Sequence, residues 1–135
     1  MKEFVRGQTD DRLRTLAAQI DRVAEDGAPD AIHDLRVAIR RLSRCLRAFA
    51  SFYPGRSWKH ARGELSELLH AAGEVRDRDI ALEMLAKARV NPSRAIVARL
   101  EAERRAGHAR FLEEVRLWRD GKAVQKWRRR LEVSR

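Results

Sequence analysis

The sequence predicts an all-α fold: an antiparallel four-helix bundle-like domain with short extra helices. Glycine and proline, which interrupt helices, number only 7 and 3 in 135 residues. Apolar residues recur three and four positions apart, and no segment shows the strict alternation of a half-buried strand. With 44% hydrophobic residues, the chain can bury one core, so we expect a single domain over residues 1–135.

The first two expected helices are separated by a short Gly-Ala-Pro-Asp break. Thr9 or Asp10 can cap the first helix, which continues to about residue 26. Asp30 can cap the second helix, which we expect over about residues 31–53, just before a Pro-Gly pair. Both helices carry their apolar residues on one face, as packing against a common core requires.

The second half of the chain predicts further helices with short connections. A third helix is expected over about 56–75, and residues 73–79 interrupt its pattern before a short helix at 80–86. Residues 90–93 form a loop, and Ser93 in that loop caps a helix that ends at Asp120-Gly121. These elements complete a helical core at about residues 9–120.

A last basic helix, about residues 122–133, has one apolar stripe and dense positive charge. Helices of this composition bind membrane surfaces or partner proteins. Alternatively, Trp127 packs on the bundle and the charges join those of the second helix. We favour the second interpretation, because the segment is short.

The net charge of +10 and the pI of about 11.0 indicate a polyanionic partner, such as nucleic acid, an anionic membrane or polyphosphate. The excess is concentrated in two segments. Residues 31–62 carry eight Lys or Arg against one acid, and residues 116–135 carry eight against two. Arginine dominates, and its planar fork of donors suits two phosphate oxygens at once.

The second expected helix separates its basic and apolar residues onto opposite sides. At about 100° per residue, the basic residues form a stripe roughly 80° wide. A solvated structural face normally mixes acids and bases at i,i+4, whereas these side chains repel one another unless a polyanion binds. Successive guanidinium groups lie one turn apart, about 5–6 Å, so an extended phosphate chain could follow them. The stripe consists of His33, Arg36, Arg40, Arg44 and Arg47, with Arg41 on its flank.

Other chemical motifs are weaker. His33-Asp34 resembles the metal-binding pair of phosphohydrolases, but further ligands at suitable spacing are missing, so we favour a hydrogen-bonding or pH-sensitive role for His33. Asp77 and Asp79 can bind a metal, but capping a helix and pairing with arginines is the favoured role. No Gly-rich phosphate loop, nucleophile motif or zinc-type Cys/His set is present. The sequence therefore predicts no catalytic residue, no metal and no cofactor.

The cellular compartment follows from what the sequence lacks. No apolar run approaches the length of a membrane span, and the first residues lack the apolar region of a signal peptide. The single cysteine, Cys45, cannot form an internal disulfide and falls on the apolar side of its helix. We therefore expect a cytoplasmic protein with a buried, inert thiol.

Two motifs resemble those of the CHAD family, the conserved histidine α-helical domain. The resemblance covers most of residues 9–120 and implies a helical, basic domain that binds inorganic polyphosphate and associates with polyphosphate or storage granules. The pattern His-x-x-Arg-Val-x-x-Arg-Arg-Leu is matched by His33, Arg36, Val37, Arg40, Arg41 and Leu42, and Gly-x-x-Arg-Asp-x-Asp by Gly73, Arg76, Asp77 and Asp79. By position, the resemblance implies a polyphosphate site of His33, Arg36, Arg40, Arg41, Arg44 and Arg47, with Lys59 and Arg76 as weaker additions.

The resemblance also implies a partner. Family members typically have two four-helix halves that share one basic site, and this chain corresponds to one half of a CHAD domain. We therefore expect a homodimer that restores the second wall. Two other functions stay open: sequence-independent nucleic-acid binding, and a metal-dependent phosphohydrolase. Against the first, the stripe lacks aromatic side chains for base stacking.

Overall fold

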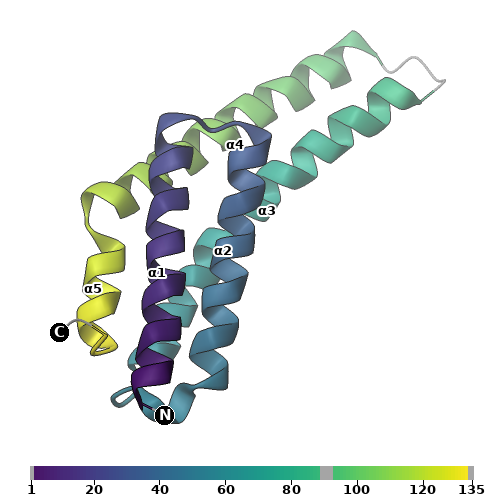
Figure 1. The fold of residues 1–135 in the computed structure, drawn as a ribbon. Coiled ribbons are helices and arrows are strands. Elements are labelled where there is room, and N and C mark those ends of the chain that lie inside the picture. The colour runs from purple at the N-terminus through teal and green to yellow at the C-terminus, as the bar shows by residue number, and fades with distance from the viewer. Residues whose placement is uncertain (1, 89–92, 134–135) are drawn as a thin grey trace.

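Five α-helices pack into a bundle, as the sequence predicts, in a computed structural model that describes residues 2–88 and 93–133 (Figure 1). No strand occurs in these two ranges. The elements are α1 (Lys2–Glu25), α2 (Pro29–Ala48), the 3-10 turn η1 (Ala50–Phe52), α3 (Ser57–Lys87), α4 (Arg94–Asp120) and α5 (Ala123–Arg130).

The core lies where the first four helices meet. α1 packs against α2 and α4, and α3 packs against α2 and α4, so each of these helices has two neighbours. Leu13, Leu35, Leu65 and Phe111 contribute one fully buried side chain from each helix. Burying such a side chain stabilises the fold by about 1.5–3 kcal/mol. The short α5 lies beside α1 at the lower end of the bundle in Figure 1 and also contacts α3 and α4.

The end of α3 and the start of α4 extend beyond α1 and α2 as a two-helix arm (Figure 1). With no third helix against it, this arm leaves apolar side chains in solvent. Met84 is 66% exposed and Ile96 is 52% exposed. Within the described fold, the apolar residues of this arm are therefore incompletely packed.

The predicted N-terminal cap of the first helix is wrong. α1 already includes Lys2, so Thr9 and Asp10 lie inside the helix. The Thr9 hydroxyl is fully buried, donates to the carbonyl oxygen of Val5 at 2.7 Å and lies 2.7 Å from the Tyr53 hydroxyl. This short polar side chain therefore satisfies a buried hydrogen-bond network, a role that local sequence does not distinguish from capping.

The boundaries of α2 also differ from the prediction. The helix begins at Pro29 and its N-cap is Ala28, without a side-chain cap, so Asp30 lies in the first turn instead. Proline is favoured at this first position because its missing N–H has no helical partner there. The helix ends at Ala48, and η1 covers part of the remainder of the expected element.

The predicted break at residues 73–79 is also wrong, since α3 runs through it without interruption. Val75 is buried there, and Asp79 accepts a hydrogen bond from Arg104 Nε of α4 at 2.6 Å. A glycine inside a helix costs roughly 1 kcal/mol, which this packing outweighs at Gly73.

The later helix ends agree better with the sequence. Ser93 caps α4, with its Oγ accepting from the Ile96 N–H at 3.2 Å, as predicted. Residues 90–92 of the expected loop lie outside the described residues. α4 ends at Asp120, and α5 is shorter than predicted because the backbone turns at Glu132, whose φ is 56°.

Candidate functional site

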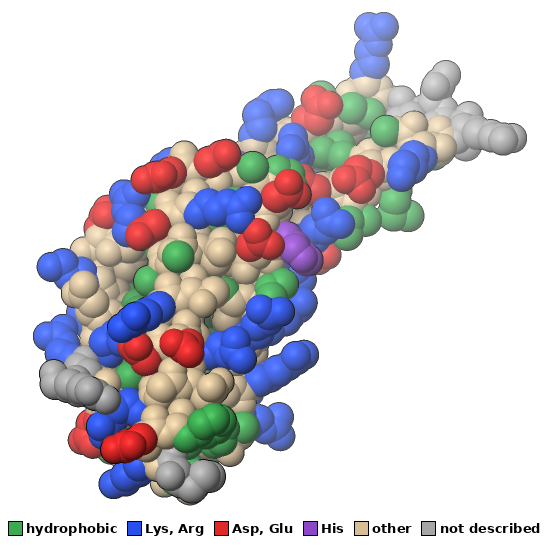
Figure 2. Space-filling model, in the orientation of Figure 1, with side chains coloured by type: hydrophobic (Ala, Val, Ile, Leu, Met, Phe, Trp, Pro, Cys, Tyr) green, Lys and Arg blue, Asp and Glu red, His purple; other side chains and the backbone are tan. Residues whose placement is uncertain are grey.

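The two sides of α2 differ as the sequence predicts. Its inner side is fully buried at Leu35, Ile39 and Leu42. Lys and Arg side chains protrude in a row along the edge of the molecule where α2 lies (Figure 2). On α2, Arg36 is half-buried, and the exposed members of the predicted site are His33, Arg40, Arg41, Arg44 and Arg47.

These basic side chains have no acidic partners in the described chain. None of the eight predicted site residues forms an ion pair within residues 2–88 and 93–133. The acid Asp34 of α2 is bound instead by Arg22 of α1, with Nη1 2.6 Å from Oδ2. Within the described chain, no ion pair therefore offsets the repulsion among the positive charges of α2.

Arg36 carries the clearest electrostatic strain. Its Nε is buried and has no hydrogen-bond partner. Burial, followed by the charges of Arg40 and Arg76, lowers the pKa of Arg36 from its ordinary value, and Asp77 opposes this only in part. A buried donor without a partner costs about 1–3 kcal/mol. A bound anion that accepts a hydrogen bond from Arg36 Nε would remove this cost.

The two sequence motifs meet in a small pocket between α2 and α3. Its volume is about 180 Å³, and it is lined by His33 and Arg36 from the first motif and by Arg76 and Asp79 from the second. Asp30 lies in the same pocket, which therefore contains acids as well as bases. The structure thus brings Arg76 to the α2 site, although forty residues of sequence separate it from Arg36.

A second groove between α2 and α3 contains a basic residue that the motifs do not include. Ser43, Lys59 and Arg62 line this groove of about 390 Å³. Arg62 Nε donates to Ser43 Oγ at 3.1 Å, which holds the guanidinium across the two helices. Lys59 lies 5.6 Å from the Trp58 ring centroid. The high positive charge of residues 31–62 was the sequence signal for Arg62.

The helix α5 does not join this site. Trp127 is buried and donates to Glu64 Oε2 at 3.3 Å, which confirms that it packs on the bundle. Arg128 pairs with Asp10 of α1 and Arg130 with Glu64 of α3. In Figure 1, α5 lies on the far side of α1 from α2, so the prediction that its charges add to the α2 stripe is wrong.

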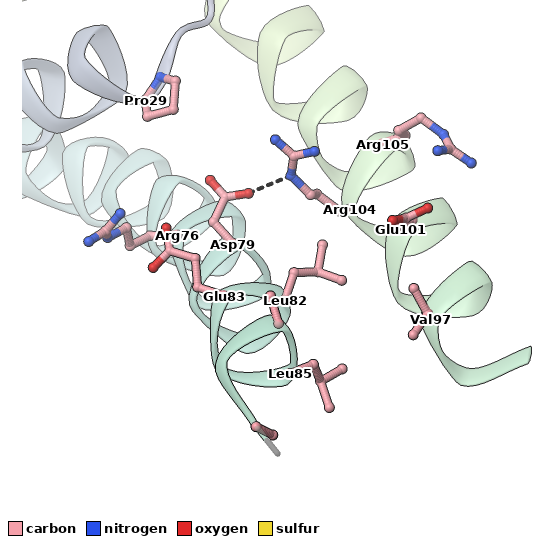
Figure 3. A pocket seen from close by; sticks show the side chains of 12 residues that line it. Pro29, Arg76, Asp79, Leu82, Glu83, Leu85, Val97, Glu101, Arg104 and Arg105 are labelled. Carbon is pink, nitrogen blue, oxygen red and sulfur yellow. Dashed lines mark hydrogen bonds and ion pairs between the residues drawn. The ribbon is translucent and has the colours of Figure 1, made fainter. Parts of the chain in front are cut away.

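A further groove of about 780 Å³ separates the end of α3 from the start of α4 (Figure 3). Leu82 and Leu85 of α3 face Val97 of α4 across it. The ion pair between Asp79 and Arg104 bridges the two helices at one end. This groove is lined by both acids and bases, unlike the stripe on α2.

Three further observations concern metal binding, the cysteine and the membrane. Within the described residues, no three His, Cys, Asp or Glu side chains gather as a metal site would require. Cys45 is buried, with its Sγ 3.8 Å from both the Thr9 and Tyr53 hydroxyls. Among the helices that the structure describes, none combines the length and apolar composition needed to cross a bilayer.

The fold and the site define an all-α protein that exposes a concentrated, uncompensated arginine surface on one helix. The CHAD domain profile matches residues 7–135, so the chain belongs to the CHAD family. CHAD domains are associated with polyphosphate binding and are generally non-catalytic. Neither curated proteins nor solved structures gave a significant match to the chain.

Proposed function

We propose that the protein is a non-enzymatic binding module for inorganic polyphosphate. The observation that carries this proposal is the arginine row of α2, which has no carboxylate partner in the described chain. Membership of the CHAD family supports the same ligand. Binding requires neither a metal nor a cofactor, because guanidinium groups supply both the charge and the hydrogen bonds.

Each arginine contributes in two ways. Its planar fork donates to two phosphate oxygens, and its charge displaces counterions from the polymer. Because the donors of α2 follow one another at about one helical turn, the phosphate chain runs along the helix. The proposed site consists of His33, Arg36, Arg40, Arg41, Arg44 and Arg47, with Lys59 and Arg76 from α3.

Calorimetric titration with long-chain polyphosphate at two salt concentrations tests this proposal, with duplex DNA as competitor. We expect binding that weakens steeply as salt rises, because counterion release drives it. DNA should displace the polymer poorly. Absence of binding, or equal displacement by DNA at matched phosphate concentration, would reject a dedicated polyphosphate site.

Nucleic-acid binding is a second candidate, and one observation favours it. Phe4, Phe49 and Phe52 form edge-to-face pairs with centroids 6.2 and 6.4 Å apart, and Phe4 is 56% exposed. Phe49 lies beside Arg44 in a groove between α1 and α2. Exposed aromatic rings next to arginines can stack bases of a single strand.

The variant Phe4→Ala separates these two functions. It should leave polyphosphate affinity unchanged, because inorganic phosphate has no base to stack. A selective loss of single-stranded DNA affinity would support nucleic-acid binding. Release of phosphate from the polymer with Mg²⁺ or Mn²⁺ would instead support the third candidate, a metal-dependent phosphohydrolase, for which Asp79 is poorly placed because Arg104 already binds it.

The proposal includes a homodimer formed through the α3–α4 arm. Met84 and Ile96 are exposed there, and two arms related by a two-fold axis would bury them in a four-helix arrangement. The groove is lined by acids and bases, among them Glu83, Glu101 and Arg105, so a second copy of the same surface can pair opposite charges across a two-fold axis. The adjoining pocket at Arg76 places this interface next to the α2 site.

Light scattering at micromolar concentration tests the dimer. We expect a dimer for the natural chain and a monomer for Met84→Glu with Ile96→Glu. Leu117→Glu is the matched control, since Leu117 is 67% exposed on α4 but lies near the C-terminal end of that helix, away from the arm. A monomeric natural chain with full polyphosphate affinity would reject the dimer.

Polyphosphate binding also gives the protein a cellular location, the surface of polyphosphate or storage granules in the cytoplasm. A fluorescent fusion should collect at such granules in cells that accumulate polyphosphate. Replacement of Arg36, Arg40 and Arg44 by alanine should disperse it. Granule association that survives this replacement would assign the location to another part of the chain.

A further inference from the structure

A groove of about 620 Å³ lies between α1 and α2, on the opposite flank of the α2 stripe from α3. Arg12 and Gln8 of α1 face Arg41 and Arg44 of α2 across it. Cys45, Ala48 and Phe49 also line the groove and give it apolar wall area. Arg12 belongs to neither of the two sequence motifs.

This groove is positive without compensation. No carboxylate lines it, and neither Arg12 nor its two partners on α2 form an ion pair in the described part of the chain. Arg14, only two residues from Arg12, does pair with an acid, its Nε lying 2.9 Å from Asp10 Oδ2. The pocket between α2 and α3 at His33 differs, because Asp30 and Asp79 are among the residues that line it.

The groove between α2 and α3 that is lined by Ser43, Lys59 and Arg62 is likewise positive without a lining acid. Its basic residues are Lys59 and Arg62, and no carboxylate lines it. Ser43 lines this groove and Arg41 lines the groove beside α1. Positions two residues apart on a helix, such as Arg41 and Ser43, differ by a rotation of about 200°. The two grooves therefore flank α2 on opposite sides. Arg40, Arg44 and Arg47 project from the ridge between them.

We propose that the groove between α1 and α2 is a second phosphate-binding subsite, in which Arg12 and Gln8 contact the ligand. One long polyphosphate chain that follows the arginine row of α2 also reaches into this groove on one side of the ridge and to Lys59 and Arg62 on the other. This inference rests on the proposed function. A helix with its side chains is about 10–12 Å wide, so tripolyphosphate is too short to occupy both grooves, whereas a long chain gains from joining them.

The two ligands and the variant Arg12→Ala test the inference by calorimetry. For long-chain polyphosphate, we expect Arg12→Ala to lower affinity about tenfold, the loss typical of one charge-assisted hydrogen-bond pair. For tripolyphosphate, the natural chain should bind at two sites and Arg12→Ala at one. Arg62→Ala should lower long-chain affinity similarly while leaving the α1–α2 subsite intact.

Arg14→Ala is the matched control, because it removes the same charge from the same helix but from an arginine that is already paired. It should change long-chain affinity less than twofold. Circular dichroism and thermal melting confirm that each variant is folded. If the natural chain binds neither ligand, the proposed function fails. If it binds the long chain and Arg12→Ala binds it equally well, the second subsite is overturned while the proposed function stands.

Discussion

The helices α2 and α4 differ in whether their arginines form ion pairs. In α4, Arg99 pairs with Glu103 one turn away, and Arg104 pairs with Asp79 of α3. In α2, no arginine forms an ion pair in the described ranges, and the acid Asp34 is held by another helix. Both helices are rich in arginine, but α4 carries five acids whereas α2 carries only Asp30 and Asp34, so the difference lies in the number and pairing of the acids.

That difference distinguishes arginines that are neutralised by ion pairs within the protein from arginines whose charge is available to a ligand. Exposed ion pairs such as those of α4 contribute about 0–1 kcal/mol each and neutralise the surface locally. The unpaired row of α2 instead raises the free energy of the empty protein through repulsion. A compositional bias toward arginine would enrich both helices but would not by itself leave the arginines of one helix without acidic partners. The absence of ion pairs to the α2 arginines in the described chain therefore marks the site.

The largest expected effect comes from removing the unpaired charges together. Replacing Arg36, Arg40 and Arg44 by alanine should weaken polyphosphate binding more than about 100-fold, because each charge-assisted contact contributes about 1.5–3 kcal/mol. The dependence of log affinity on log salt should also become shallower by roughly three. Titration at several salt concentrations measures both quantities, and circular dichroism should show unchanged helicity.

The control for this prediction removes three arginines that are already paired. Arg14, Arg99 and Arg119 each lie within hydrogen-bond distance of an acid. Their joint replacement by alanine changes the net charge by the same amount as the α2 variant. It should lower affinity by less than about tenfold, through the long-range field alone. Equal losses in the two variants would mean that total charge, and not the α2 row, governs binding.

A smaller effect should appear in the stability of the empty protein. Arg36→Met keeps the length of the side chain but removes a buried donor without a partner and one of several repelling charges. We expect the free energy of unfolding to rise by about 1 kcal/mol, measured by urea denaturation, while polyphosphate affinity falls.

Arg22→Met provides the contrasting case, because Arg22 is exposed and paired with Asp34. This variant should leave stability unchanged or lower it by up to about 1 kcal/mol. A loss of stability in Arg36→Met as large as that in Arg22→Met would show that the α2 row is not strained in the absence of ligand.

The sequence was sufficient for the fold class and for the two sides of α2, since both depend on a periodic pattern. The apolar face of α2 is buried from Ile32 to Leu46, and the basic residues of the helix other than Arg36 are exposed, as the 100° rotation predicts. The sequence was misleading where tertiary contacts override local preference. Thr9 has the chemistry of a cap but serves a buried network with Tyr53, and Gly73 does not break α3.

The candidate site was only partly predictable for a related reason. Periodicity groups residues on one helix, but it does not say which neighbouring helix lies beside them. Arg62 and Arg12 belong to other helices and contribute to the grooves only because α1 and α3 pack on either side of α2. Likewise, the basic residues of α5 resemble those of α2 in sequence, but Asp10 and Glu64 bind two of them elsewhere.

The smallest expected effect concerns the repulsion between two carboxylates, which protonation at low pH removes. Burial, and then the charge of Glu67, raises the pKa of Glu114 above its ordinary value. A carboxyl with a raised pKa in the folded state stabilises the protein fully below its unfolded pKa, and this contribution is lost as pH rises through the folded value. Glu114→Gln should therefore match the natural chain at about pH 3 and exceed its stability at neutral pH, by less than about 1 kcal/mol because the group is partly solvated.

Urea denaturation at several pH values measures this difference, and Glu113→Gln is its control, since the neighbouring Glu113 is exposed and loses the same charge. Only Glu114→Gln should gain stability as pH rises. An equal gain in Glu113→Gln would assign the effect to net charge. The contrast with α2 is chemical: protonation of a carboxylate relieves the repulsion between Glu67 and Glu114, whereas a guanidinium group is not deprotonated in ordinary protein environments. For the α2 row, a bound anion is therefore the available source of relief.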